Sequence, residues 1–318
     1  MKLFAVTGLI LFSPLYAAFA SSFTGLYVFG DSLSDNGNAY IASAGAFPGS
    51  NYGSYTFAGT NLTTQYFSDG PNTTPKAAGP SGLWVDQLAG KLGVSDPQPF
   101  LAGGTNYAVA SAQTGNSNPQ DIGNQLALFS IGHPTGAPST ALYALWGGAN
   151  DILDGHSPTA AANNMESYIS TLAAEGAKNF VWLNLPLLGD TPRGKPMQAV
   201  LNAASMSFDT QWSVDLAALQ GKGIDVTGVN IESLFAAIIG NPGGYGFSNV
   251  TDAAQGLPLA TDAGYLSWDG LHPTTAGHAL IADAVVNSLA PVPEPASIGL
   301  MIFGVLAIAG FGAKKRLS

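Results

Sequence analysis

The segment GDSLSDNGN, residues 30–38, directly follows the short apolar run LYVF at residues 26–29. An apolar run of this length predicts a buried strand, and the Gly, Asp, Ser and Asn residues after it predict a turn at its carboxyl end. Open α/β sheets place their chemistry at the carboxyl ends of their strands. We therefore expect the first strand to end near Gly30 and to present Ser32 at the mouth of a site.

A second segment, WDGLHP at residues 268–273, supplies the partners that a hydroxyl nucleophile needs. A serine hydroxyl attacks efficiently only when a base takes its proton, and histidine suits this role because its pKa lies near neutrality. A carboxylate can then orient the ring and fix which nitrogen carries the proton. We predict Ser32 as the nucleophile, His272 as general base and then acid, and Asp269 as the orienting carboxylate.

Short apolar runs alternate with longer helical patterns between these two segments. Strands are expected at residues 26–29, 106–110, 142–146, 180–185 and 224–229, and helices at residues 82–92, 120–131, 159–175, 197–220, 231–239 and 274–289. Continuous apolar runs are typical of parallel strands that are covered on both faces. The alternation therefore predicts an α/β protein, a three-layer α/β/α sandwich around a mostly parallel five-stranded sheet.

The composition excludes several classes of function. Hydrophobic residues make up 46% of the 318 residues, charged residues only 9%, and the net charge is −10. This balance argues against nucleic acid and anionic lipid as partners, because both are bound through basic patches. Cysteine is absent, and no two of the four histidines have the His-x-x-x-His spacing of a helical zinc site. We expect neither a metal nor another cofactor.

Both ends of the chain have the composition of processing segments. Residues 1–20 start with Lys2, continue with an apolar core and end on Ala-Phe-Ala, which predicts a secretory signal peptide. Near the other end, the run from 296 to 313 is apolar and is followed by Lys-Lys-Arg. That run is long enough to cross a bilayer as a helix, with the basic residues on the cytoplasmic side. The domain between these segments is expected to cover residues 21–290.

Two long segments, residues 36–80 and 241–265, fit neither a helix nor a strand pattern. The first is rich in small, polar and aromatic residues and begins just after Ser32, so we expect it to shape a substrate cleft. The second contains Tyr245 and Phe247, which are candidates for lining the same cleft. For both segments, ordinary loop packing is the alternative.

Four segments stand in order along the chain: GDSLSD at 30–35, GTNYAVASA at 104–112, GGAND at 147–151 and WDGLHP at 268–273. Together they resemble the GDSL/SGNH hydrolase family over residues 25–290. The stretch YGFSNVTD at 245–252 is similar to the bacterial branch that holds GDSL phospholipases, thermolabile haemolysins and autotransporter esterases. The resemblance implies a flavodoxin-like SGNH fold and an esterase or lipase that forms an acyl-enzyme.

The resemblance also implies three hydrogen-bond donors for the oxyanion of an acyl transfer. They are the Ser32 backbone N–H, a backbone N–H within the second segment and the Asn150 side-chain amide. The family usually has a Gly-Gly pair where this chain has Ala110-Ser111. A backbone N–H donates whatever its side chain, but a Cβ at this point crowds the acyl carbon or opposes a positive φ. We assign the second donor to Ser111, with Ala110 as the alternative.

The segment at residues 291–318 contains VPEP before its apolar run and resembles the PEP-CTERM sorting tail of Gram-negative bacteria. This resemblance implies an exosortase-type processing enzyme as a partner. It also implies an exported protein of the cell envelope or exterior, with transient anchoring in the membrane through the tail. A simple single-span anchor is the alternative.

The expected function is an exported serine esterase, for which phospholipids, other lipid esters and acetylated sugars are all candidate substrates. Two alternatives remain open. The first is an acyltransferase that uses the same three residues and passes the acyl group to a sugar or sterol hydroxyl. The second is a weakly active surface protein that binds within an exopolysaccharide matrix; the Ala110-Ser111 departure favours it, and the intact Ser32, Asp269 and His272 oppose it.

Overall fold

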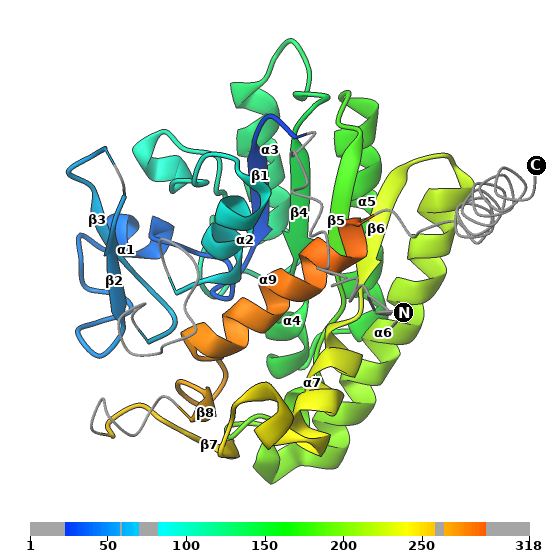
Figure 1. The fold of residues 1–318 in the computed structure, drawn as a ribbon. Coiled ribbons are helices and arrows are strands. Elements are labelled where there is room, and N and C mark those ends of the chain that lie inside the picture. Colours follow the sequence, from blue (N-terminus) through cyan, green and yellow to red (C-terminus); the bar gives the residue numbers. More distant parts are fainter. Residues whose placement is uncertain (1–22, 58, 70–81, 258–263, 291–318) are drawn as a thin grey trace, which may run out of the picture.

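The computed structural model describes residues 23–57, 59–69, 82–257 and 264–290 (Figure 1). A parallel sheet lies at its centre, with the strand order β1-β4-β5-β6. Its strands are β1 (Leu26–Gly30), β4 (Leu142–Trp146), β5 (Asn179–Leu183) and β6 (Asp225–Val229). The predicted α/β class with a parallel central sheet is thereby confirmed.

Helices cover both faces of this sheet. On one face α2 (Trp84–Leu92) packs against α9 (Thr275–Leu289), which crosses in front of the strands in Figure 1. On the other face α5 (Pro158–Ala174) packs against α6 (Gln198–Gly221), and α3 (Ile122–Gly132) contacts β1. Each of these helices covers a range that the sequence predicts to be helical.

The structure differs from the prediction in one strand, at residues 106–110. This segment lies beside β1, where the Tyr107 N–H donates to the Val28 carbonyl, but it meets β1 in an isolated bridge between Val28 and Asn106 rather than a ladder. The named strands of the described sheet are therefore four, not five. The segment still takes the edge position next to β1, which gives the chain the 2-1-3-4-5 order of flavodoxin-like folds.

Side chains explain why residues 106–110 do not continue as a regular strand. The Ala108 N–H donates to Asn106 Oδ1, and the Ala110 N–H donates to Asp35 Oδ2. These side-chain acceptors satisfy the donors that face away from β1. Local side-chain bonds of this kind offer the backbone an alternative to a ladder, and the chain turns at Ser111.

The segment that begins at residue 36 is not structureless as expected. It contains α1 (Asn38–Ala42) and an antiparallel hairpin of β2 (Gly53–Thr56) and β3 (Thr63–Tyr66). Its far end reaches the start of α9, where the Ser68 hydroxyl donates to the Pro273 carbonyl at 2.9 Å. We call the described residues 36–57 and 59–69 the hairpin insertion.

The remaining elements are two helices, a pair of short strands and several 3₁₀ turns. They are α4 (Ala149–Leu153), α7 (Ile231–Gly240), β7 (Asn249–Ala253) and β8 (Tyr265–Ser267), with short 3₁₀ turns at Phe100–Ala102, Leu188–Asp190, Lys195–Met197 and Pro242–Tyr245. β7 and β8 pair in parallel. A small second core of Ile238, Phe247, Leu266 and Ala276 joins α7, this strand pair and α9.

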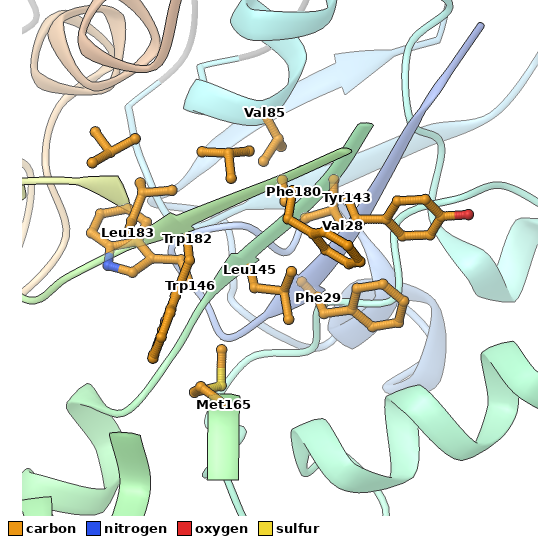
Figure 2. Packing of buried hydrophobic residues seen from close by; sticks show 14 of the residues in the cluster. Val28, Phe29, Val85, Tyr143, Leu145, Trp146, Met165, Phe180, Trp182 and Leu183 are labelled. Carbon is orange, nitrogen blue, oxygen red and sulfur yellow. The ribbon is translucent and has the colours of Figure 1, made fainter. Parts of the chain in front are cut away.

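The main hydrophobic core lies on both faces of the sheet, as Figure 2 shows for β4 and β5. All five residues of β4, LYALW, are buried. Alternate side chains of a strand point to opposite faces, so a strand that is apolar at every position needs cover on both sides. The paired helix layers supply that cover.

The predicted signal peptide at residues 1–20 and the tail at residues 291–318 lie outside the described residues. Within the described part of the chain, no helix has both the length and the apolar composition needed to span a membrane.

Truncating Leu145 tests how strongly the central strand stabilises the fold. Leu145 is fully buried, and Leu145→Ala removes apolar contacts and leaves a cavity, so we expect the free energy of unfolding to fall by about 3 kcal/mol. Urea denaturation followed by tryptophan fluorescence measures the change. Leu128 is 42% exposed, so the control Leu128→Ala should change stability by less than about 0.5 kcal/mol. Equal effects of the two variants would contradict this packing of the core.

Candidate active site

The turn that carries Ser32 is fixed at the end of β1. Gly30 exchanges two hydrogen bonds with the buried Gln125 side chain: its N–H donates to Oε1 at 3.0 Å, and Nε2 donates to its carbonyl at 2.7 Å. A Cβ on Gly30 would lie 2.4 Å from the Trp146 carbonyl oxygen, so only glycine lets β1 and β4 approach this closely. The Asp31 carboxylate then accepts from the Leu33 N–H at 3.0 Å and closes the turn around Ser32.

The second part of the site is a tight loop between β8 and α9. The Trp268 N–H donates to the His272 carbonyl at 2.8 Å. Within this loop Asp269 Oδ1 accepts from the backbone N–H groups of Leu271 at 2.7 Å and His272 at 2.8 Å. These bonds hold the carboxylate beside the imidazole of the residue three positions later.

A continuous chain of hydrogen bonds joins the two parts. His272 Nε2 lies 2.7 Å from Ser32 Oγ, and His272 Nδ1 lies 2.7 Å from Asp269 Oδ2. An ionised carboxylate can only accept, so Nδ1 donates to Asp269, and Nε2 is then free to accept from the serine hydroxyl. The structure thus brings together residues that are 240 positions apart in the sequence.

The environment of Asp269 keeps it ionised. Burial raises the pKa of this carboxyl, but the hydrogen bond and charge of His272 and the N–H donors of the loop outweigh it and hold the pKa below its ordinary value. An ionised Asp269 stabilises the positive charge that the imidazole gains when it takes a proton.

The backbone turn after residue 110 decides between the two candidate donors there. The Ala110 N–H is occupied by Asp35 Oδ2 at 2.9 Å. Ser111 is exposed and has φ of 63°, a left-handed conformation that favours glycine. Among the described residues, no acceptor binds the N–H of Ser111 or of Ser32. Ser111 is therefore the donor of this pair that remains available to a ligand.

Asn150 lies in the first turn of α4, next to the same backbone turn. Its Nδ2 donates to the Ala112 carbonyl at 2.9 Å, which leaves its second N–H available. Gly148 before it has φ of 115°, and a Cβ there would lie 2.5 Å from the Phe208 ring. Glycine is therefore required for the chain to turn from β4 into α4 and present Asn150 beside Ser32.

A pocket opens next to Ser32 and His272. It is lined by Asp31, Ser32, Leu33, Trp146, Ala149, Asn150, Leu153, Pro186, Leu187, Leu188, Asp190, Thr191, Glu232, Phe235, Ala236, Ile239, Val250, Leu266, Ser267, Leu271, His272 and Pro273. Most of these side chains are apolar. The acids Asp31, Asp190 and Glu232 are among them, whereas no described lining residue is Lys or Arg.

The aromatic residues of the two segments do not line this pocket as expected, although Val250 of the second segment does. None of the described residues of the hairpin insertion is among the lining residues. Phe247 is 4% exposed and packs in the second core, with Tyr245 against it. Ordinary packing, the alternative given above, describes both residues. Trp146 and Trp268 stand next to the GGAND and DGLHP residues in the sequence; both are buried, and of the two only Trp146 is among the lining residues.

Sequence patterns did not predict the contacts that the hairpin insertion makes with the acid and the base. The Tyr52 hydroxyl donates to Asp269 Oδ2 at 2.7 Å. The Phe67 ring lies 5.1 Å from the His272 ring, measured between centroids. These residues are more than 200 positions from their partners, and no local pattern connects them.

No group of three or more His, Asp or Glu side chains within the described ranges could hold a metal ion.

Residues 26–285 match the sequence profile of the family described as GDSL-like Lipase/Acylhydrolase. This chain belongs to that family. The match confirms the predicted family and the predicted enzyme class, an esterase or lipase of the GDSL type. Residues 291–316 match the PEP-CTERM protein-sorting motif, which confirms the predicted sorting tail and implies export through that sorting route.

Several curated proteins are similar to this chain. Phosphatidylcholine-sterol acyltransferase of Aeromonas hydrophila is 26% identical over 89% of this chain and 84% of its own length. Esterase EstA of Pseudomonas aeruginosa is 27% identical over 90% of this chain, and an uncharacterized Pseudomonas putida protein from the trpE-trpG intergenic region is 28% identical over 87%. This chain covers 50% of the length of each of these last two proteins.

Solved structures give a more distant likeness. A catalytic mutant of Axe2, an acetylxylan esterase from Geobacillus stearothermophilus, aligns with a TM-score of 0.46 and 13% identity over 83% of this chain and 93% of that chain.

The buried carboxyl of Asp31 makes the stability of the fold depend on pH. Burial raises its pKa to about 6, above the value of about 3.9 for an unfolded chain. The folded protein therefore binds this proton more tightly than the unfolded chain does. Ionisation of the buried carboxyl lowers the free energy of unfolding as the pH rises from about 4 through 6. In Asp31→Asn the acceptor for Leu33 remains, and the free energy of unfolding relative to wild type should rise by about 2 kcal/mol between pH 4 and pH 7.5.

Chemical denaturation at the two pH values measures this difference. Asp225 at the start of β6 is exposed, so Asp225→Asn is the control and should show no comparable rise. A constant difference between Asp31→Asn and wild type at both pH values would contradict the burial argument.

Proposed function

We propose that this chain is an exported serine esterase that hydrolyses carboxylic esters through Ser32, His272 and Asp269. The single observation that carries the proposal is the hydrogen-bond chain from Ser32 Oγ through the imidazole to Asp269, with both distances at 2.7 Å. A serine hydroxyl in contact with a neutral imidazole nitrogen, itself oriented by a carboxylate, is the arrangement that activates serine for attack on an acyl carbon.

The first half of the reaction acylates the enzyme. Ser32 Oγ forms a bond to the acyl carbon while its proton moves to His272 Nε2, and the carbonyl electron pair moves onto the oxygen. When this tetrahedral intermediate collapses, the ester C–O bond breaks and the leaving alkoxide takes the proton from Nε2. The products are an alcohol and an acyl-enzyme on Ser32.

The second half releases the acid. Water gives a proton to His272 Nε2 as its oxygen attacks the acyl carbon, and the carbonyl electron pair moves onto the carbonyl oxygen. Collapse re-forms the carbonyl, breaks the bond between the acyl carbon and Ser32 Oγ, and returns the proton from Nε2 to Oγ, which releases the carboxylic acid. In both halves the oxyanion is stabilised by the N–H groups of Ser32 and Ser111 and the amide of Asn150, each worth about 3 kcal/mol of transition-state stabilisation.

The pocket favours a neutral, apolar acyl group as the substrate part next to the ester. The apolar lining includes Leu153, Leu187 and Phe235, and the lining also contains three acids but no Lys or Arg among the described residues. An apolar chain gains free energy from leaving water here, whereas an anionic group would meet like charges from Asp190 and Glu232. Esters of fatty acids therefore suit the pocket better than acetylated sugars do.

An acyltransferase is the second candidate. Its support is the 26% identity to a protein named phosphatidylcholine-sterol acyltransferase. The two functions share the acyl-enzyme and differ in whether water or an alcohol takes the acyl group. A role restricted to matrix binding has less support, because Ser111 takes the required positive φ in spite of its Cβ.

Export and processing complete the proposal. The sorting motif at residues 291–316 supports action in the cell envelope or outside the cell, with an exosortase-type enzyme as the processing partner and transient anchoring through the tail. The signal peptide at residues 1–20 remains a prediction, which N-terminal sequencing of the exported protein would test.

Hydrolysis of p-nitrophenyl esters from C2 to C16 by the full chain tests the proposed reaction. We expect kcat/KM to rise about fourfold per added CH2 until the acyl chain outgrows the pocket, since each buried CH2 contributes about 0.8 kcal/mol. Ser32→Ala should lose at least about 10³-fold in kcat. Adding an alcohol acceptor and analysing the products separates hydrolysis from acyl transfer. Equal activity of wild type and Ser32→Ala on every ester would contradict the proposal.

Filling the pocket should change the chain-length preference. Ala236 on α7 lines the pocket and is exposed, so Ala236→Trp adds bulk without disturbing the core. We expect kcat/KM for the longest esters to fall by about 10- to 100-fold while the C2 ester changes less than about threefold. Ala237 is exposed on the same helix and is not among the lining residues, so Ala237→Trp should leave the profile unchanged.

A further inference from the structure

Tyr52 lies directly before β2, in the hairpin insertion, and neither it nor Asp269 is among the residues that line the pocket. Its hydroxyl donates to Asp269 Oδ2 at 2.7 Å. The same oxygen accepts from His272 Nδ1, also at 2.7 Å. Tyr52 and the base therefore share one carboxylate oxygen.

These bonds complete the coordination of the carboxylate. Asp269 Oδ1 accepts from two backbone N–H groups of its own loop, those of Leu271 and His272. Oδ2 accepts from one tyrosine and one imidazole. Because a carboxylate is planar, the loop bonds to Oδ1 also orient Oδ2, and the two side-chain donors on Oδ2 add a second restraint against rotation about the Cβ–Cγ bond.

The hairpin insertion holds Tyr52 in place and contacts the base as well. The Tyr52 ring packs edge-on against Phe67, with 5.5 Å between centroids, and Phe67 packs against the His272 ring at 5.1 Å. The Ser68 hydroxyl donates to the carbonyl of Pro273, the residue after the base, at 2.9 Å. Burial and the neighbouring Asp269 carboxylate raise the pKa of Tyr52 to about 12, so the hydroxyl stays protonated and remains a donor across the working pH range.

We propose that Tyr52 is a positioning residue for the ester hydrolysis described above, holding Asp269 Oδ2 toward His272 and drawing part of its negative charge away from the imidazole. This inference rests on the proposed function of the site. It assigns to the hairpin insertion the role of supporting the acid and base, in place of the substrate contact expected from its sequence.

The loss of the hydroxyl has two separate consequences. Without Tyr52 the carboxylate is less firmly oriented, which lowers the rate of proton transfer. At the same time Oδ2 keeps more of its charge, which favours the protonated imidazole and moves the acid limb of the pH–rate profile to higher pH. The other titratable groups that act on the imidazole are Asp31 after β1 and the buried His278 on α9, and both stay unchanged.

Tyr52→Phe in the full chain is the test. It keeps the ring and its contact with Phe67 and removes only the hydroxyl. We expect kcat to fall about tenfold with KM within about twofold, the effect of one hydrogen bond to a charged group, and the acid limb of the pH–rate profile to move to higher pH. The control is Tyr40→Phe, since Tyr40 lies on α1 of the same insertion and its hydroxyl bonds to no described residue. It should match wild type in rate and pH profile.

A measurement that needs no turnover separates this inference from the proposed function. The proton between His272 Nδ1 and Asp269 Oδ2 gives a downfield ¹H resonance, and Tyr52→Phe should move it further downfield because Oδ2 loses its competing donor. A shifted resonance in a chain inert on every ester would overturn the esterase proposal and keep the positioning role. A wild-type resonance together with wild-type kcat and pH profile in Tyr52→Phe would overturn the positioning role.

Discussion

The constraint that the rest of the site depends on is the 2.7 Å hydrogen bond between His272 Nε2 and Ser32 Oγ. It joins the turn after the first strand to the loop before the last helix, so both loops must be held in place for the two atoms to meet. Each side is fixed locally: Gly30 is locked by Gln125, and the loop is closed by its own backbone bonds. Neither loop can shift by an ångström without breaking the bond.

Buried carboxylates connect this contact to the oxyanion donors. Asp35 accepts from the N–H groups of residues 37, 38, 39 and 110, and so ties α1 to the turn at Ser111. Asp151 accepts from the backbone and hydroxyl of Thr114 and ties the start of α4 to the same stretch. In a chain with only 9% charged residues, several of the few charges serve the framework of the site. Buried charges of this kind are tolerated because hydrogen bonds replace the water they lose.

The site has two sides with different tasks. On one side, an apolar pocket between α4, α7 and the turn after β5 faces Ser32 and suits an acyl chain. On the other, the hairpin insertion contacts Asp269 and the His272 ring. Substrate contact and support of the proton-transfer groups are thus divided between elements that are far apart in the sequence. The pocket can vary with little effect on the groups that move the proton.

The α/β class, the longer helices, the sorting tail and the candidate residues Ser32, Asp269 and His272 could be predicted from the sequence, because apolar periodicity and short motifs are local properties of a chain. The short helices α1 and α4 were not predicted. The three-dimensional arrangement was needed to show that residues 106–110 are an irregular edge, since Asn106 and Asp35 take their outward N–H groups. It was likewise needed to show that Ser111 rather than Ala110 keeps a free N–H, and that Tyr52 reaches Asp269. These outcomes depend on which side chain, distant in the sequence, contacts a given backbone donor or carboxylate oxygen in the folded chain. A pattern within a short stretch of sequence cannot predict such a contact.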